Sequence, residues 1–368
     1  MKIGYDGKRF FHNATGLGNY SRDLIRIMAK FIPENQYILY NTAVKKINRI
    51  AIDGTSIQEK LYSGLKLLSG FWRFSSIKKD LIKDQITIYH GLSGEIPVGL
   101  KKTKIKSVVT IHDLIFVRYP KLYFILDRKI YFWKFKYAAK NADLVVAISE
   151  QTKKDIVLFL GIDENKIKVV YQGCASEFKE QSTQKQLDDT SKKYNLPSKF
   201  LLNVGTIESR KNILSVIKAI NGTEIPLVVI GKKTSYFLEI EKYIFENKIE
   251  NQIIFLESIP IKELSDIYKL ATIFVYPSLF EGFGIPIIEA LYSKTAVITS
   301  TGSCFEEAGG KSTIYVTPNE IDVLKKEILN LWNNKFLRKT QETDGYYFVQ
   351  KFNDQEIAKN WNEIYKSL

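Results

Sequence analysis

The chain has 368 residues, of which 45% are hydrophobic and 26% charged, and its formal net charge is +14. This length is enough for two domains, and this composition is typical of a folded protein, which argues against the disordered class. No run of 18 uncharged apolar residues occurs, so no membrane-spanning helix is predicted. The polar start Met1–Asp6 is unlike a signal peptide, and the two isolated cysteines, Cys174 and Cys304, favour a reducing, cytoplasmic location.

Short β-branched runs alternate with helical patterns in the first half of the chain. The predicted strands are Lys2–Tyr5, Gln36–Tyr40, Ile86–Tyr89, Ser107–Ile111, Asp143–Ile148 and Lys168–Tyr171. The predicted helices between them are Asn19–Phe31, Leu122–Lys140 and Glu150–Leu160. This alternation predicts a parallel sheet with helices on both faces.

The same alternation starts again after a polar, strand-poor segment, Cys174–Ser198. The predicted strands are Phe200–Val204, Leu227–Ile230, Ile253–Phe255, Thr272–Tyr276 and Ala296–Thr299, and the predicted helices are Asn212–Ile220, Ile261–Leu270 and Pro286–Tyr292. We therefore predict an α/β protein with two doubly wound domains that face a cleft, and a boundary close to residue 174. Ligands in such folds bind at the carboxyl ends of the strands.

A pair of glycines follows the first predicted strand. Gly16 and Gly18 lie in the stretch Thr15–Tyr20, at the start of a predicted helix. Glycines in this position let backbone N–H groups approach a phosphate at a helix N-terminus. An ordinary turn fits the two glycines equally well, so both interpretations stay open at this point.

His112 comes directly after the predicted strand Ser107–Ile111. A histidine at the carboxyl end of a parallel strand can act on a bound substrate near neutral pH. We predict that His112 lies at the edge of the cleft, with a buried or capping histidine as the alternative.

A basic loop follows the strand Phe200–Val204. It begins at Gly205 and carries Arg210 and Lys211 just before the helix predicted from Asn212. An arginine fork and a lysine charge beside a helix N-terminus are suited to a diphosphate. The alternative is a solvated basic pair.

Two glutamates eight positions apart follow the strand Thr272–Tyr276. Glu281 lies on a loop, and Glu289 lies in the helix predicted from Pro286. A carboxylate can accept hydrogen bonds from two neighbouring hydroxyls, so this pair suits a polyol ligand that also carries phosphate. The loop between them consists of small and aromatic residues that allow close approach of the backbone: Gly282, Phe283 and Gly284.

The sequence contains no Asp-x-Asp motif, the pattern expected of a metal-dependent sugar-nucleotide enzyme. We therefore expect no metal site and no cofactor. The negative charge of a leaving diphosphate would be neutralised by Arg210, Lys211 and helix N–H groups.

The positive charge is concentrated in the first half of the chain. Residues 1–180 hold 31 of the 54 Lys and Arg but only 17 of the 40 Asp and Glu, so the remainder is neutral. This asymmetry indicates an anionic partner of the first half, such as nucleic acid, an anionic membrane or a phosphorylated substrate. A basic surface that serves only solubility is the alternative.

These features together resemble the retaining GT-B glycosyltransferases of family 4 and, more loosely, the members of that family that transfer mannose or rhamnose. The resemblance rests on the glycine pair, the basic loop, the Glu-x7-Glu spacing of Glu281 and Glu289, and three short matches: His112–Asp113, Ala147–Glu150 and Tyr171–Gly173. It implies two Rossmann-like domains, residues 1–173 for the acceptor and 174–351 for the nucleotide sugar. It also implies that 352–368 form a helix that crosses back to the first domain.

The resemblance implies a role for each matched residue on the donor side. Glu281 would hold hydroxyls of the donor sugar with the loop 282–284, and Glu289 would hold the ribose near Gly205. Arg210 and Lys211 would bind the diphosphate.

On the side of the first domain, His112 would lie against the transferred sugar, near the reacting carbon, so that the catalytic pair would be His112 and Glu281. Gly16 and Gly18 would approach phosphate or acceptor. Thr206 departs from the family pattern, which places an arginine there, and Arg210 is the candidate replacement for the missing charge.

We expect a hexosyltransferase that moves a sugar from a GDP-, UDP- or dTDP-linked donor to a hydroxyl of a glycan, with retention. The expected acceptor is linked to polyprenyl diphosphate. The basic run Lys101–Lys106 and the aromatic stretch Tyr131–Tyr137 would place the enzyme at the inner membrane face, although Tyr131–Tyr137 fits a core helix equally well. The alternatives are a nucleotide-sugar epimerase and, since no nucleic-acid motif is present, a less favoured non-catalytic nucleic-acid-binding protein.

Overall fold

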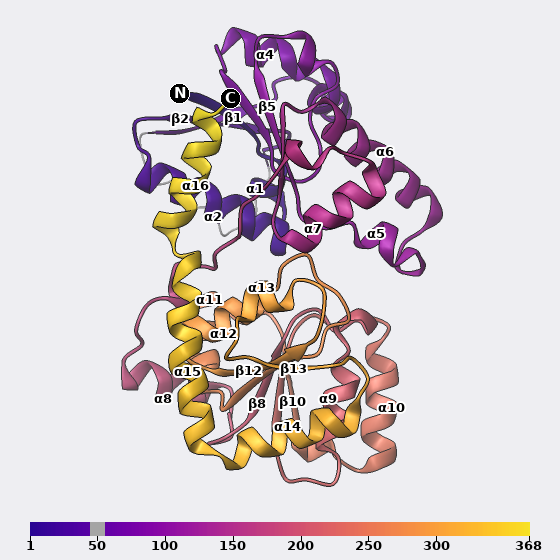
Figure 1. Cartoon of the computed structure of the whole chain (residues 1–368), viewed down its shortest axis with the longest axis vertical. Helices are drawn as coiled ribbons and strands as arrows, with labels where there is room; N and C mark the ends of the chain where they lie inside the picture. Colours follow the sequence, from indigo (N-terminus) through magenta and orange to yellow (C-terminus); the bar gives the residue numbers. More distant parts are fainter. Residues whose placement is uncertain (45–55) are drawn as a thin grey trace. The chain divides into compact units, whose positions relative to one another are not determined.

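The computed structural model describes residues 1–44 and 56–368 (Figure 1). The chain divides into two compact units. Unit 1 consists of Met1–Gly173 and Phe352–Leu368, and unit 2 consists of Cys174–Lys351. Each unit is a parallel sheet with helices on its faces (Figure 1).

Unit 1 has a seven-stranded sheet in the order β3-β2-β1-β4-β5-β6-β7. Its strands are β1 (Lys2–Asp6), β2 (Gln36–Asn41), β3 (Ile57–Leu61), β4 (Ile88–Gly91), β5 (Lys106–Ile111), β6 (Leu144–Ala147) and β7 (Ile167–Val169). The helices used below are α1 (Lys8–His12), α2 (Gly16–Phe31), α4 (Ile77–Lys83), α6 (Ile125–Asn141), α7 (Glu150–Asp155) and α16 (Asp354–Lys366).

Both faces of this sheet are buried, because alternate residues of one strand enter different cores. In β2, Tyr37 and Leu39 pack into the cluster that also contains Trp361 of α16, whereas Ile38 and Tyr40 pack into the cluster on the other face. Strands that are covered on both sides read as continuous apolar runs, which is why the sequence marks them clearly.

Unit 2 has a six-stranded sheet in the order β10-β9-β8-β11-β12-β13. Its strands are β8 (Leu201–Val204), β9 (Leu227–Ile230), β10 (Ile253–Leu256), β11 (Ile273–Tyr276), β12 (Ala296–Ser300) and β13 (Ile314–Val316). Its longer helices are α8 (Gln184–Lys193), α9 (Ile213–Ile220), α10 (Phe237–Asn247), α11 (Ile261–Leu270), α12 (Ile285–Tyr292), α14 (Ile321–Asn333) and α15 (Lys335–Val349).

The strand order of each unit contains a switch point, where chain order reverses direction across the sheet. In unit 1 this point lies between β1 and β4, and in unit 2 it lies between β8 and β11. Ligands of doubly wound folds bind outside the carboxyl ends of the strands at such a point. The loops that follow β1, β4, β8 and β11 are therefore the positions to inspect in each unit.

The predicted strands are confirmed to within two residues at each end, but β3 and β13 were missed. β3 is an edge strand with the polar sequence Ile57-Gln58-Glu59-Lys60-Leu61, and β13 has only three residues, so neither forms an apolar run. The short helix α1 was also missed, so Gly16 follows this helix and does not follow β1 directly.

The predicted return of the C-terminal helix to the first domain is confirmed. Ile357, Trp361 and Tyr365 of α16 are buried in the core of unit 1. No helix in the described part of the chain is long and apolar enough to cross a membrane.

Candidate active site

The loops after β8 and β11 meet at the switch point of unit 2. The Leu279 N–H donates to the Arg210 carbonyl oxygen at 2.8 Å, and Nη1 of Arg210 donates to the Phe280 carbonyl oxygen at 2.5 Å. These bonds join two segments that are 70 residues apart in the sequence. They bring Arg210, Lys211 and Glu281 into one cluster.

One carboxylate oxygen of Glu281 is the centre of this cluster. Oε1 lies 2.7 Å from Nζ of Lys211 and 2.8 Å from Nη1 of Arg210. It also accepts hydrogen bonds from the hydroxyls of Ser278, at 2.5 Å, and Tyr276, at 3.0 Å. Neither hydroxyl was foreseen, although both residues belong to the end of β11 or the loop that follows it.

The charge of Glu281 is strongly stabilised. Burial by itself would raise the pKa of this carboxyl, but Lys211 and Arg210 outweigh burial and lower it to about 2. Glu281 is therefore ionised at neutral pH and is a weak base. An ionised carboxylate of this kind can bind and orient hydroxyls, whereas a general base needs a pKa closer to the working pH.

The second oxygen of Glu281, Oε2, accepts no hydrogen bond from the residues that the structure describes. The side chain is 12% exposed, and Oε2 is not among the buried polar atoms that lack a partner. One oxygen is thus saturated by protein, and the other is open to a ligand.

The charge of Arg210 is already balanced by protein carboxylates. Besides Glu281, its guanidinium contacts Oε1 of Glu208 at 2.6 Å. Lys211 is likewise held by Glu281 and by the Tyr276 hydroxyl at 2.6 Å. This cluster contains two cations and two carboxylates, so an arriving diphosphate would have to compete for these cations with Glu208 and Glu281.

Two glycines of these loops adopt backbone angles that other residues avoid. Gly205 has φ +151° and lies beneath Lys211, whose Cε would be 3.7 Å from a Cβ placed there. Gly284 has φ +108° and precedes the first residue of α12. Both positions therefore require glycine.

A turn that was not predicted anchors the Glu281 loop from the other side. The Ser303 hydroxyl donates to the Glu281 carbonyl oxygen at 3.0 Å, and the Cys304 thiol donates to the Phe283 carbonyl oxygen at 2.9 Å. Gly282 and Phe283 are buried beneath this turn. The loop is therefore held from both sides, which fixes the backbone on both sides of Glu281.

Glu289 lies further into its helix than was expected. It is the fifth residue of α12, past the first turn that carries the open N–H groups. Its Oε2 accepts a hydrogen bond from the Tyr268 hydroxyl of α11 at 3.0 Å. Glu289 is half-buried, and its position is fixed by Tyr268.

In unit 1, both ring nitrogens of His112 are engaged by protein. Nε2 lies 2.9 Å from the Leu92 carbonyl oxygen, and Nδ1 lies 3.1 Å from the side-chain amide nitrogen of Gln172. The amide donates to Nδ1, so Nε2 carries the proton and donates to Leu92. Burial lowers the pKa of His112 to about 4, the Leu92 carbonyl opposes this change, and Arg9 adds to it. His112 is thus a neutral, nearly buried ring, which rests edge-on against Tyr20.

The two glycines of unit 1 that were predicted to approach a phosphate, Gly16 and Gly18, have different surroundings. A Cβ on Gly18 would lie 1.8 Å from the Asn13 carbonyl oxygen, so the close approach of α1 and α2 requires glycine there. A Cβ on Gly16 would meet nothing within 4 Å. Gly18 is explained by packing, and Gly16 lies in the open at the start of α2.

Two family models match the chain, one in each unit. The model described as "Glycosyltransferase Family 4" matches residues 16–178, and the model described as "Glycosyl transferases group 1" matches residues 184–348. The chain is therefore a family 4-like glycosyltransferase. The predicted resemblance is thereby confirmed, and the two matches meet close to the boundary between the units.

Relatives of this glycosyltransferase include enzymes of bacterial O-antigen synthesis. It is 24% identical to O-antigen chain mannosyltransferase B of Escherichia coli over the full length of both chains. It is also 28% identical to O-antigen chain mannosyltransferase RfbU of Salmonella typhimurium, over 61% of this chain and 60% of that protein.

Solved structures share the fold of this glycosyltransferase over its whole length. A sucrose-phosphate synthase from Thermosynechococcus elongatus has a TM-score of 0.81 at 19% identity and covers 100% of this chain and 98% of its own. A glycosyltransferase from Rickettsia africae has a TM-score of 0.76, with the same identity and coverage. The predicted GT-B fold is therefore confirmed.

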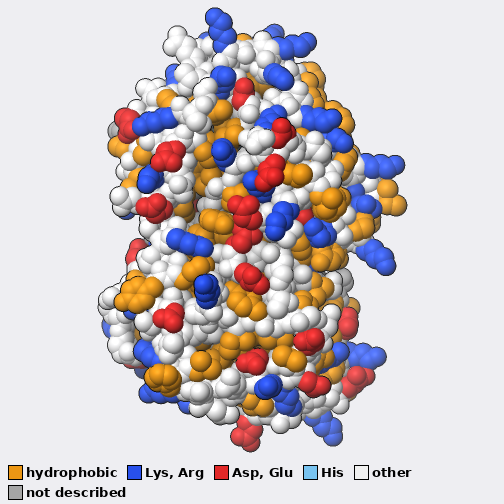
Figure 2. All heavy atoms as spheres, viewed as in Figure 1, with side chains coloured by type: hydrophobic (Ala, Val, Ile, Leu, Met, Phe, Trp, Pro, Cys, Tyr) orange, Lys and Arg blue, Asp and Glu red, His pale blue; other side chains and the backbone are white. Residues whose placement is uncertain are grey.

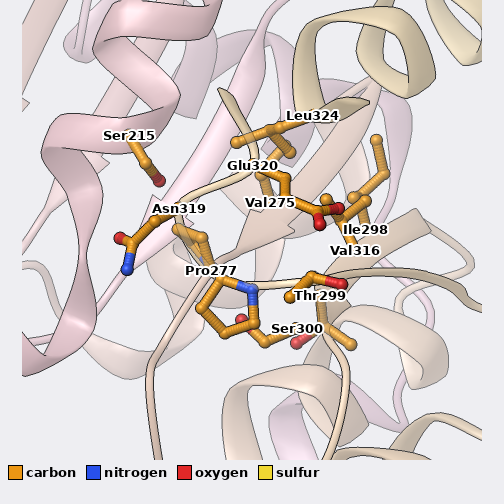
Figure 3. Close-up of a pocket in the computed structure, with 12 residues that line it drawn as sticks. Ser215, Val275, Pro277, Ile298, Thr299, Ser300, Val316, Asn319, Glu320 and Leu324 are labelled. Carbon is orange, nitrogen blue, oxygen red and sulfur yellow. The ribbon is translucent and has the colours of Figure 1, made fainter. Parts of the chain in front are cut away.

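Unit 2 of this glycosyltransferase contains a cavity that is too small for a substrate. It measures about 10 Å³ and lies among residues that include Ser215, Pro277, Ser300 and Glu320 (Figure 3). The Ser300 hydroxyl is buried and has no partner among the described residues. A space of this size holds at most one water molecule, which could bond to Ser300.

Proposed function

We propose that this glycosyltransferase moves a sugar from a nucleotide-diphosphate donor to a hydroxyl of a glycan acceptor during the synthesis of a surface polysaccharide. The open oxygen of Glu281 is the observation that carries the proposal. An ionised carboxylate with one oxygen saturated and one free is suited to hold sugar hydroxyls in a fixed orientation. The relatives in O-antigen mannosyl transfer support mannose as the sugar.

The roles of the neighbouring residues follow from their positions. Arg210 and Lys211 bind the diphosphate, and Glu281 keeps both cations in place until it arrives. Glu289, oriented by Tyr268, binds the ribose, and Gly205 leaves space for the nucleotide beside Lys211. No divalent metal is part of this proposal, because these cations neutralise the leaving diphosphate.

We propose that the sugar keeps its anomeric configuration. A double displacement would need a carboxylate nucleophile and a nearby acid, but the cations that hold Glu281 make it a weak nucleophile. The departing phosphate would accept the proton of the acceptor hydroxyl on the same face of the sugar. His112, whose two ring nitrogens are both engaged by protein, would contribute shape and not proton transfer.

A panel of donors tests the proposed function. The purified enzyme is incubated with GDP-, UDP- and dTDP-linked sugars, with and without a glycan acceptor, and in the presence of EDTA. We expect acceptor-dependent release of one nucleoside diphosphate, an EDTA-insensitive rate, and a product with the anomeric configuration of the donor by NMR. Conversion of the donor to an isomer without acceptor would contradict the proposal and favour an epimerase.

We further propose that the acceptor is linked to polyprenyl diphosphate, and that unit 1 binds the anionic cytoplasmic face of the membrane. The surface that supports this is the first half of α6 and the turn before it. Phe124 is 83% exposed, Leu126 is 74% exposed and Trp133 is 52% exposed. Of the aromatic stretch predicted to contact the membrane, Tyr131 and Trp133 are exposed, whereas Phe135 and Tyr137 pack against the core.

A second apolar segment extends this surface. Leu67 and Phe71 are exposed, and the ring of Phe74 lies 5.9 Å from the ring of Trp133 on α6. Apolar and basic side chains lie together at this edge of unit 1 (Figure 2). Exposed apolar surface with basic neighbours is typical of proteins that bind anionic lipid. The basic run Lys101–Lys106 lies elsewhere, at the amino end of β5, where it lines an open groove.

The membrane proposal predicts the effect of a single substitution. Phe124→Ser should reduce flotation with anionic liposomes at least several-fold, because it removes an exposed apolar side chain from the binding surface. Phe336→Ser in unit 2 is the matched control, since Phe336 is also 83% exposed. Equal flotation of both variants, or binding that salt does not weaken, would contradict the membrane contact.

A further inference from the structure

Two cations stand at the switch point of unit 1, where nothing has yet been assigned. β1 ends at Asp6, and Lys8 and Arg9 form the first turn of α1 directly after it. The neighbouring strand across the switch point is β4, which ends at Gly91. This is the edge at which a doubly wound sheet binds its ligand.

The carboxylates at this edge are taken by other cations. Asp6 is buried and receives hydrogen bonds from Nε of Arg73 to both of its oxygens, at 3.0 and 2.9 Å. Nη1 of Arg73 contacts Glu95 at 2.6 Å, and Nζ of Lys134 contacts the other oxygen of Glu95 at 3.4 Å. Two carboxylates are thus balanced by two cations, Arg73 and Lys134.

Lys8 and Arg9 form no ion pair with these two carboxylates. Neither side chain donates a hydrogen bond to any residue that the structure describes, although Arg9 is half-buried. The side chains of the other described arginines all donate hydrogen bonds to protein acceptors. These arginines are Arg22, Arg26, Arg73, Arg118, Arg128, Arg210 and Arg338. An arginine has five N–H donors in a rigid fork, so a half-buried one without a partner is an unused binding group.

The surroundings of this pair favour an anion. Burial lowers the pKa of Lys8, and the positive charges of Arg73 and Arg9 lower it further, against the opposing effect of Glu95 and Asp6. Arg9 also lowers the pKa of His112, which places its charge within electrostatic reach of that ring. A bound anion would relieve the repulsion among these cations.

We propose that Lys8 and Arg9 form a binding site in unit 1 for a phosphoryl group of a substrate. The guanidinium of Arg9 forms paired hydrogen bonds to phosphate oxygens, and Lys8 adds a second charge, so that the pair matches a group with a charge of about −2. This proposal rests on the proposed function, which supplies two sources of the phosphoryl group: the diphosphate of a lipid-linked acceptor and the diphosphate of the nucleotide donor.

Substitution of Arg9 in the full-length enzyme separates these sources. Arg9→Gln should raise KM at least tenfold for a polyprenyl-diphosphate-linked acceptor if the acceptor is the source, and for the nucleotide sugar if the donor is. Arg9→Lys should recover part of the loss. Lys168→Gln is the control, because Lys168 is an exposed lysine on β7, four strands away from β1 in the sheet.

A direct binding measurement keeps the test independent of activity. The ring signals of His112, one of three histidines, are followed by NMR while inorganic pyrophosphate is added. They should shift in the wild type and in Lys168→Gln, and stay unchanged in Arg9→Gln. Unchanged KM values together with an unchanged pyrophosphate response in Arg9→Gln would overturn the site. Absence of transfer in the wild type with an Arg9-dependent response would refute the proposed function and leave the site standing.

Discussion

Replacement of Glu281 by glutamine is expected to lower the rate of transfer by about 10²–10³-fold, the range found when one fixed polar group is removed from an active site. The amide keeps the shape of the side chain but removes the negative charge that holds Lys211 and Arg210 at 2.7 and 2.8 Å. The amide also has an N–H₂ group in place of one carboxylate oxygen, so the side chain can no longer offer one oxygen to the cations and a second oxygen to the sugar hydroxyls. Steady-state kinetics with the donor identified by the panel would measure the loss.

The same substitution should destabilise unit 2. Because the folded-state pKa of Glu281 is about 2, below its ordinary value of 4.5, the ionised carboxylate contributes about 3 kcal/mol above pH 4.5, which is lost as the pH falls towards 2. Glu246→Gln is the control, because Glu246 forms an exposed i,i+4 pair with Lys242. If Glu281→Gln transfers sugar as fast as Glu246→Gln, Glu281 does not position the donor.

Unit 1 is expected to lose stability steeply between pH 6.5 and 4, whereas unit 2 is not. All three histidines belong to unit 1. Burial, assisted by His112, lowers the pKa of His90 to about 3, and burial lowers that of His112 to about 4. The unfolded chain protonates both rings near pH 6.5, so below this pH it binds more protons than the folded state, and the free energy of unfolding falls. The two rings together should remove about 3 kcal/mol per pH unit.

Pulse proteolysis in urea at pH 6.5 and 4.5 would measure this effect, with fragments assigned to each unit by mass spectrometry. His90→Phe should reduce the pH dependence of unit 1 by about half, because one of the two titrating rings is removed. A parallel loss of stability in both units would show that the buried histidines are not the cause.

The fold was largely predictable because the strands of both sheets are buried on two faces. Such strands appear as apolar runs bounded by turns, so β8, β9 and β11 could be located from the sequence. β3 was not predicted because it is an edge strand of mixed polarity. The end of β11 at Tyr276 also placed the Glu281 loop correctly, since parallel strands end at one edge of the sheet.

The partners within the site were less predictable than its location. The sequence paired Arg210 and Lys211 with a diphosphate, but in the fold both contact Glu281, and Arg210 also contacts Glu208. Such pairing depends on rotamers and on the register between two loops, which no local pattern specifies. The hydrogen bond between the His112 ring and Gln172 could not be predicted for the same reason, since the two residues are 60 positions apart in the sequence.

The helix α16 has a consequence for how the protein is made. Trp361 is buried in the core of unit 1, and the centre of its ring lies 4.6 Å from that of His90, whose Nδ1 lies 2.8 Å from the Tyr365 hydroxyl. Unit 2 is one continuous segment, but unit 1 needs residues from both sides of it. On the ribosome, unit 2 can finish folding while the core of unit 1 still lacks its last helix. Unit 1 can therefore complete its core only after α16 has been synthesised, which happens after the whole of unit 2.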